Sequence, residues 1–68
     1  MNWNLEGLRV EATYLEEIPV VGRVELSRVK YGGAVCHTVV LDTPIIVYGA
    51  CRDRVIVDHG TVERVMTH

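Results

Sequence analysis

The chain has 68 residues, which is enough for one hydrophobic core and too few for a second domain, so we expect a single domain over residues 1–68. Its hydrophobic fraction is 49%, without Phe and with 13 Val residues, and this composition favours β-strands. Seven basic against nine acidic residues give a formal net charge of −2, which lacks the basic excess of nucleic-acid-binding proteins, so we do not expect a nucleic acid as partner.

The sequence shows neither a membrane-spanning segment nor a signal peptide. None of its apolar segments approaches the roughly 18 residues of a membrane-spanning helix, and the N-terminus has no signal-peptide pattern. We therefore expect a cytoplasmic protein without a membrane partner. Cys36 and Cys51 lie far apart without a CxxC pattern, which predicts reduced, buried thiols, with a disulfide or a metal pair as the alternative.

The first clear element is a strand that begins at Leu8, after a lead-in over residues 1–7. Within the lead-in, Trp3 and Leu5 could cover one end of the core. From Leu8 onward apolar and polar residues alternate with the period of a half-buried strand. The apolar set is Leu8, Val10, Ala12 and Tyr14. Pro19 disfavours helical backbone at the residue before it, which predicts a turn over residues 16–19.

A second strand follows over residues 20–29 and changes its apolar face on the way. Its apolar residues start on one face, at Val20, Val24 and Leu26. Val29 has the opposite parity, so we expect a bulge or sharp bend near Ser27 and Arg28. Gly22 in the same strand predicts a further kink or a close approach of two backbones. A long, bent second strand is what a small barrel needs in order to serve both of its sheets.

Tyr31-Gly32-Gly33 is the strongest hairpin signal, because glycine adopts the positive φ of a tight hairpin turn without steric cost. The third strand, over residues 34–41, must then pair antiparallel with the second, and both of its faces are largely apolar. Turns and short strands alternate after it: turns over residues 42–44 and 49–53, strands over residues 45–48 and 54–58, a break at His59-Gly60 and a last strand over residues 61–66.

These elements predict an all-β protein, since no window shows a sustained 3.6-residue period. The bent second strand, the Gly32-Gly33 hairpin and the ending of strand, break at His59-Gly60 and short strand resemble the SH3-like small β-barrels. That resemblance implies a barrel of five to six short antiparallel strands. An OB-type barrel is the structural alternative. The chain also resembles small proteins of phages and mobile elements.

The sequence offers no group that we expect to be catalytic. A single histidine on an apolar strand, such as His37, is typical of hydrogen-bonded structure, and Cys36 cannot pair with it because neighbouring strand side chains point to opposite faces. The three histidines lack metal-ligand spacing. Type II dihydrofolate reductases, an SH3-like family, carry Val-Gln-Ile-Tyr on a late strand, whereas residues 55–58 here read Val-Ile-Val-Asp. We therefore expect no enzyme activity, no metal and no cofactor.

A charged turn at Arg52-Asp53-Arg54 offers guanidinium groups to an anion or a partner. Residues expected to contact a ligand or partner are Arg28, His37, Tyr48, Arg52, Arg54 and His59. Glu16-Glu17 is an acidic counterpart at another turn, and opposite charges on separate loops suit self-association.

Strands with two apolar faces in so short a chain imply that a partner covers part of this surface. We expect a homo-oligomer, a dimer first, and a non-enzymatic module that binds another protein or itself. The alternative is a binder of a small ligand or anion, such as a nucleotide, with its site at a subunit interface.

Overall fold

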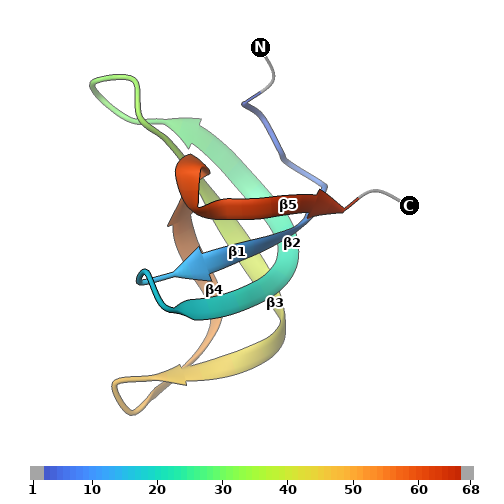
Figure 1. Ribbon diagram of the computed structural model, residues 1–68, viewed down its shortest axis with the longest axis vertical. Coiled ribbons are helices and arrows are strands. Elements are labelled where there is room, and N and C mark those ends of the chain that lie inside the picture. Colours follow the sequence, from blue (N-terminus) through green and yellow to red (C-terminus); the bar gives the residue numbers. More distant parts are fainter. Residues whose placement is uncertain (1–2, 67–68) are drawn as a thin grey trace.

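The computed structural model describes residues 3–66 as one bent sheet of five antiparallel strands, which confirms the all-β class (Figure 1). The elements are β1 (Arg9–Tyr14), β2 (Ile18–Val29), β3 (Val35–Val47), β4 (Ala50–Asp58), the 3-10 helix η1 (His59–Thr61) and β5 (Val62–Met66). The strand order is β4-β3-β2-β1-β5. No ladder joins β4 to β5 in the described part, so the sheet is open and the closed barrel stays a prediction.

The bend in β2 is a β-bulge at Glu25. The pairing of β2 with β3 shifts between Val24 and Leu26, so Glu25 is one extra residue. An extra residue reverses which side chains face the core. Val24 is buried before the bulge and Ser27 after it, while Leu26 is exposed. The predicted change of face is therefore real, but the position near Ser27 and Arg28 was wrong, as was the placement of Leu26 on the face of Val24.

Two predicted turns in the second half of the chain are wrong. Residues 42–44 are an irregularity within the long strand β3, where the pairing with β4 shifts between Val40 and Ile45. Pro44 fits there because an irregular position does not require its missing N–H for the ladder. The next turn contains only Tyr48 and Gly49, both with positive φ, and Val47 pairs directly with Ala50. A two-residue turn with positive φ at both positions is the tightest hairpin connection.

The hydrophobic core lies on the inner face of the bent sheet and is mainly valine. Val10, Val24 and Val39 are among its fully buried side chains. Leu5 of the lead-in is also buried and joins this cluster, as predicted, while Trp3 is half-buried. The β3–β4 hairpin projects away from β1 and β5, at the end opposite the β2–β3 hairpin (Figure 1). Within residues 3–66 no helix is long and apolar enough to cross a membrane.

Candidate functional site

An apolar strip crosses the outer face of β2, β3 and β4, on the side away from the core. Leu26 of β2 lies opposite Thr38 of β3, which in turn lies opposite Ile56 of β4. Leu26 is 41% exposed and Ile56 is 61% exposed, and Val40 lies on the same face of β3. An exposed row of apolar side chains on neighbouring strands is unfavourable in water and is typical of an interaction surface. We call Leu26, Thr38, Val40 and Ile56 the outer strip.

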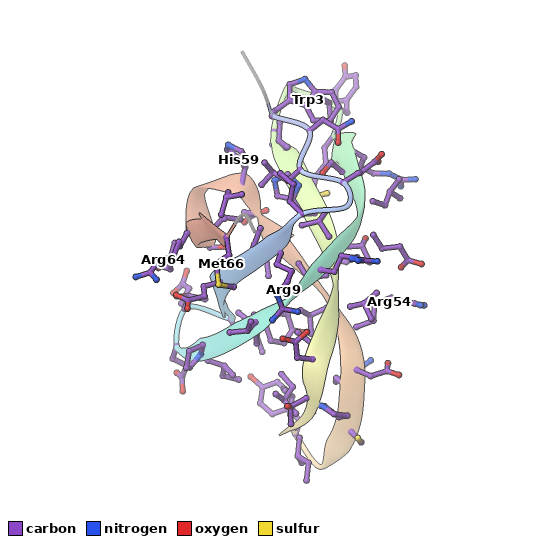
Figure 2. All side chains as sticks on the ribbon, turned by 90° about the vertical axis from the view of Figure 1, so that its right-hand side faces the viewer. Trp3, Arg9, Arg54, His59, Arg64 and Met66 are labelled. Atoms are coloured by element: carbon purple, nitrogen blue, oxygen red, sulfur yellow. The ribbon has the colours of Figure 1, made fainter. Side chains whose placement is uncertain are left out.

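Charged side chains surround the outer strip. Arg23 and Arg54 lie on either side of Val40 in the ladder, and Arg28 lies on one side of Cys36 with Asp58 on the other. Two of these charges are held by ion pairs: Arg54 Nε lies 2.9 Å from Glu25 Oε1, and Lys30 Nζ lies 3.6 Å from Asp58 Oδ1. Figure 2 shows Arg54 on the side of the sheet away from Arg64 and Met66 of β5. An apolar centre with a charged rim is the usual composition of a protein-binding surface.

The projecting β3–β4 hairpin, which we call the arm (residues 45–52), carries two more predicted contact residues. Tyr48 at its tip is 95% exposed and Ile46 is 77% exposed. Arg52 lies in β4, opposite Ile45 of β3, and not in a turn as predicted. Cys51 lies opposite Ile46 and is exposed, so the prediction of two buried thiols is correct for Cys36 and wrong for Cys51. Both cysteines are free.

A hydrogen-bonded pair of histidines, one buried and one exposed, lies where β4 passes into η1. His37 of β3 is fully buried, and its Nε2 lies 2.8 Å from Nδ1 of His59. On the other side of the ring, Nδ1 of His37 lies 2.7 Å from the hydroxyl oxygen of Ser27. The β2–β3 register places Ser27 directly opposite His37. The structure thus joins two predicted contact residues and adds Ser27, which had been considered only as the place of a bend.

The hydrogen bonds that connect Ser27, His37 and His59 have one arrangement of protons in which every donor has an acceptor. The Ser27 hydroxyl oxygen accepts a hydrogen bond from the Leu5 N–H at 3.0 Å, so its own proton is free to be donated to Nδ1 of His37. His37 then carries its proton on Nε2 and donates it to Nδ1 of His59. In the reverse arrangement the Ser27 hydroxyl proton has no acceptor within residues 3–66. Both rings are therefore neutral in this network.

This arrangement suits neither hydrolysis nor metal binding. Ser27 is only 6% exposed, so a substrate cannot reach its hydroxyl. Two nitrogens bound to one tetrahedral zinc ion lie about 3.3 Å apart, because each Zn–N bond is about 2.0–2.1 Å. The His37 and His59 nitrogens are closer, at 2.8 Å, and hydrogen-bond directly. Within the described range no group of three potential metal-ligand side chains occurs.

The environment of His37 opposes its charged form. Burial away from water lowers the pKa of His37 from its ordinary value of 6.5, and the neighbouring His59 lowers it further. A charged imidazolium has no anionic partner at hydrogen-bond distance here, since the ring contacts a hydroxyl and a second imidazole. Its burial and its partners therefore disfavour the uptake of a proton by His37.

The hollows on the surface do not collect the predicted arginines and tyrosine. A groove of about 300 Å³ lies between the end of β1 and β4, and Tyr14, Lys30 and Asp58 help to line it. A wider one of about 630 Å³ contains Arg9 and Arg23 together with the acidic residues Glu25 and Asp42. Tyr48, Arg52 and Arg54 line neither of them. The contact residues therefore separate into three places: the outer face, the arm and the histidine pair.

The fold and these sites define a small all-β protein with an apolar, charge-rimmed outer face and a hydrogen-bonded histidine pair. Comparisons with protein-family models, with curated proteins and with solved structures found no match to this chain. A functional assignment therefore depends on the geometry of the chain itself.

Proposed function

We propose that this protein is a non-enzymatic interaction module that binds another protein, with a second copy of the chain as its first partner. The observation that carries this proposal is the outer strip, where Leu26 of β2 and Ile56 of β4 are exposed on either side of Thr38 on one face of the sheet. Burial of such a strip against a partner contributes about 25 cal/mol for each Å² removed from water. The natural assembly to test is a dimer.

The total surface of the chain also supports a partner. A compact monomer of 7.6 kDa exposes about 4300 Å² according to the scaling of surface with mass. This chain exposes 4853 Å², which is larger by about 550 Å². The arm, with Ile46 and Tyr48 almost fully in solvent, projects from the sheet and adds to this surface (Figure 2).

The distribution of charge favours a second copy as the partner. Five of the seven basic residues lie on β2, on β4 or in the hairpin between β2 and β3: Arg23, Arg28, Lys30, Arg52 and Arg54. Those elements also carry three acidic residues, Glu25, Asp53 and Asp58, which leaves them a net charge of +2. On the other side, β1, β5 and the β1–β2 turn carry four acidic residues (Glu11, Glu16, Glu17 and Glu63) against Arg9 and Arg64, a net charge of −2. One copy therefore offers the charge that complements the outer face of another, as the opposite charges of the sequence suggested.

The strand arrangement is in keeping with the SH3-like resemblance, which we retain as part of the proposal. The bulge at Glu25 bends β2 so that its two halves pair with different neighbours, β1 and β3. The sharp break at His59-Gly60 separates β4 from the short strand β5. Both features were the basis of the resemblance.

The proposal is tested by the molecular mass in solution, measured by light scattering from micromolar to millimolar concentration. We expect the wild-type chain to approach the mass of a dimer, and Ile56→Lys to stay monomeric because it places a charge within the outer strip. Val65→Lys is the matched control, since Val65 is 40% exposed but lies on β5. A wild-type chain that stays monomeric throughout, or an equal effect of both substitutions, would contradict this assignment.

A second candidate function is recognition of a small anion, such as a nucleotide, at a subunit interface. Arg23, Arg28 and Arg52 are exposed and form no ion pair within residues 3–66, so their guanidinium groups are free for phosphate or carboxylate. Titration with inorganic phosphate and ATP, followed by NMR of the arginine side chains, tests this candidate. Saturable binding to the wild-type dimer that is lost in Ile56→Lys would support it, and an absence of saturable binding would exclude it.

A further inference from the structure

A continuous chain of hydrogen bonds connects exposed His59 to the N-terminal lead-in. It passes from His59 to His37 at 2.8 Å, from His37 to the Ser27 hydroxyl at 2.7 Å, and from there to the Leu5 N–H at 3.0 Å. The middle of this chain is shielded from water, because His37 is fully buried and Ser27 almost so. A change in proton number at the exposed end must therefore be transmitted inward or break the chain.

The lead-in is held to β2 by few contacts apart from this chain. The Ser27 N–H donates to Glu6 Oε2 at 2.9 Å, and the Gly7 N–H donates to the Val24 carbonyl at 2.8 Å. The Leu5 side chain is buried in the core cluster. Leu5 and Glu6 therefore both depend on the position of Ser27, which in turn depends on His37.

One added proton is incompatible with the chain as it stands. A proton on Nδ1 of His59 would face the proton on Nε2 of His37 at a nitrogen separation of 2.8 Å. The clash disappears if both hydrogen bonds reverse, so that His59 donates to His37 and His37 donates to Ser27. The Ser27 hydroxyl proton then loses its only acceptor within the described residues. A buried hydroxyl without an acceptor costs about 1–3 kcal/mol. Either way the cost falls on the position of Ser27, the residue that accepts the Leu5 N–H.

We propose that Ser27, His37 and His59 form a pH-sensitive latch, which holds the lead-in on β2 while both rings are neutral and loosens it when the pair takes up a proton. The latch would expose the apolar surface beneath Leu5 at mildly acidic pH. It is independent of the proposed self-association, because it lies on the inner face and at η1 rather than on the outer strip.

The charges around the pair do not replace the lost hydrogen bonds. The surrounding elements carry charges of both signs: Glu6 in the lead-in, Arg9 and Glu11 on β1, Arg28 on β2, Lys30 after β2, Asp58 before η1, and Glu63 and Arg64 on β5. Of these, Glu6 is bonded to the Ser27 N–H, Asp58 is paired with Lys30, and Glu63 accepts a hydrogen bond from Thr13. The lowered pKa of His37, caused first by burial and then by His59, is in agreement with a site that resists protonation.

Hydrogen exchange of single amides, measured by NMR, tests the latch in the intact chain. As the pH falls from about 6.5 to about 5.5, the Leu5 amide should lose protection by up to about tenfold per pH unit, after correction for intrinsic exchange, because one proton drives the opening; between about pH 7.5 and about pH 6.5 its protection should stay constant. The amide of Val39, in the centre of the sheet, is the internal control and should keep its protection. Equal behaviour of the Leu5 and Val39 amides would overturn the proposal.

Variants and ring spectra separate the latch from general acid instability. His59→Gln keeps an acceptor for His37 but does not titrate, so its Leu5 protection should become independent of pH. Ser27→Ala should leave Leu5 poorly protected at every pH. Nitrogen-15 spectra of the wild-type rings should show His37 protonated on Nε2 at about pH 7.5, and a changed pattern at about pH 5.5. A His37 ring protonated on Nδ1 at neutral pH, or an unchanged pH step in His59→Gln, would contradict the latch.

Discussion

The backbone of Gly22 lies directly against the carbonyl group of Val40. A Cβ atom on Gly22 would sit 2.1 Å from the Val40 oxygen and 2.8 Å from its carbonyl carbon, far inside contact distance. Gly22 pairs with Leu41, so this contact lies within the antiparallel ladder of β2 and β3, before the bulge at Glu25. Of the two alternatives predicted at Gly22, a kink or a close approach of two backbones, the structure shows the close approach, between the two longest strands.

We expect Gly22→Ala to destabilise the protein by about 3 kcal/mol, because the obstructing atoms belong to the backbone and cannot turn aside. Urea unfolding followed by circular dichroism measures the change. Gly60→Ala is the control, since a Cβ at Gly60 meets nothing within 4 Å, and this variant should be unchanged or more stable by up to about 1 kcal/mol. Equal losses in the two variants would contradict the close approach.

The valine core leads to a second prediction. Val10 is fully buried between β2 and β5, so Val10→Ala should lower the free energy of unfolding by about 2 kcal/mol through lost contacts and an unfilled cavity. Val29 is 48% exposed, and Val29→Ala should change the free energy of unfolding by no more than about 0.5 kcal/mol. Denaturant titration of both variants gives the comparison, and a large effect at Val29 would indicate burial by a partner.

The histidine pair predicts a loss of stability in mild acid. Because the pKa of His37 is lowered in the folded state, the unfolded chain binds more protons just below pH 6.5, and protonation favours unfolding. The contribution is fully present above about pH 6.5 and is lost as the pH falls below it, with a slope of at most about 1.4 kcal/mol per pH unit for one proton. Urea midpoints from about pH 8 to about pH 5 should show this slope in the wild-type chain and not in His37→Gln.

The ion pair between Arg9 and Asp42 predicts a separate change at lower pH. Arg9 of β1 binds both carboxylate oxygens of Asp42 on β3, with Nη1 at 2.9 Å from Oδ1, and this bonding lowers the pKa of Asp42 from its ordinary value of 3.8. The pair therefore stabilises the fold above pH 3.8, and its contribution disappears as the pH falls through the folded-state pKa. Both side chains are over a third exposed, so the effect is modest.

Asp42→Asn should accordingly lower the urea midpoint at neutral pH and leave it unchanged near the acid limit. Asp58→Asn is the control. It should change the urea midpoint less at neutral pH, because the Lys30 to Asp58 pair is longer, at 3.6 Å, and more exposed. A midpoint difference for Asp42→Asn that persists in strong acid would show that the substitution acts through something other than charge.

The two cysteines should differ in reactivity. Cys51 on the exposed arm should react at once with a thiol reagent in the native protein, whereas Cys36 is 6% exposed and should react only on unfolding. Counting labelled thiols by mass spectrometry against time measures this difference. Protection of Cys51 at high protein concentration, relieved by dilution, would show that the arm is covered by a second copy.

Much of the fold follows from local patterns in the sequence. The alternation from Leu8 to Tyr14 predicts β1, and the two glycines after Tyr31 predict the β2–β3 hairpin, which has positive φ at Gly32 and Gly33. These signals succeed because they act between residues next to each other in the chain. The prediction of a turn over residues 49–53 was wrong because Tyr48 adopts positive φ, a conformation that a bulky residue rarely takes.

The candidate sites depend on register, which local patterns do not contain. His37 and His59 are 22 residues apart, and they meet because β4 pairs with β3 and then breaks at η1. The only sequence signal for Ser27 was its place near the change of face, which did not reveal that its side chain points inward.

By itself, the sequence determined the all-β class, the valine-rich composition of the core, the β2–β3 hairpin and an irregularity at Gly22. Each of these depends on side-chain period or on the backbone freedom of single residues. Only the tertiary structure decided that the bulge lies at Glu25, that Leu26 and Ile56 form one outer strip, and that Ser27, His37 and His59 are connected. The physical reason is that one extra residue in a strand exchanges its inner and outer faces, and every contact between strands follows from that register.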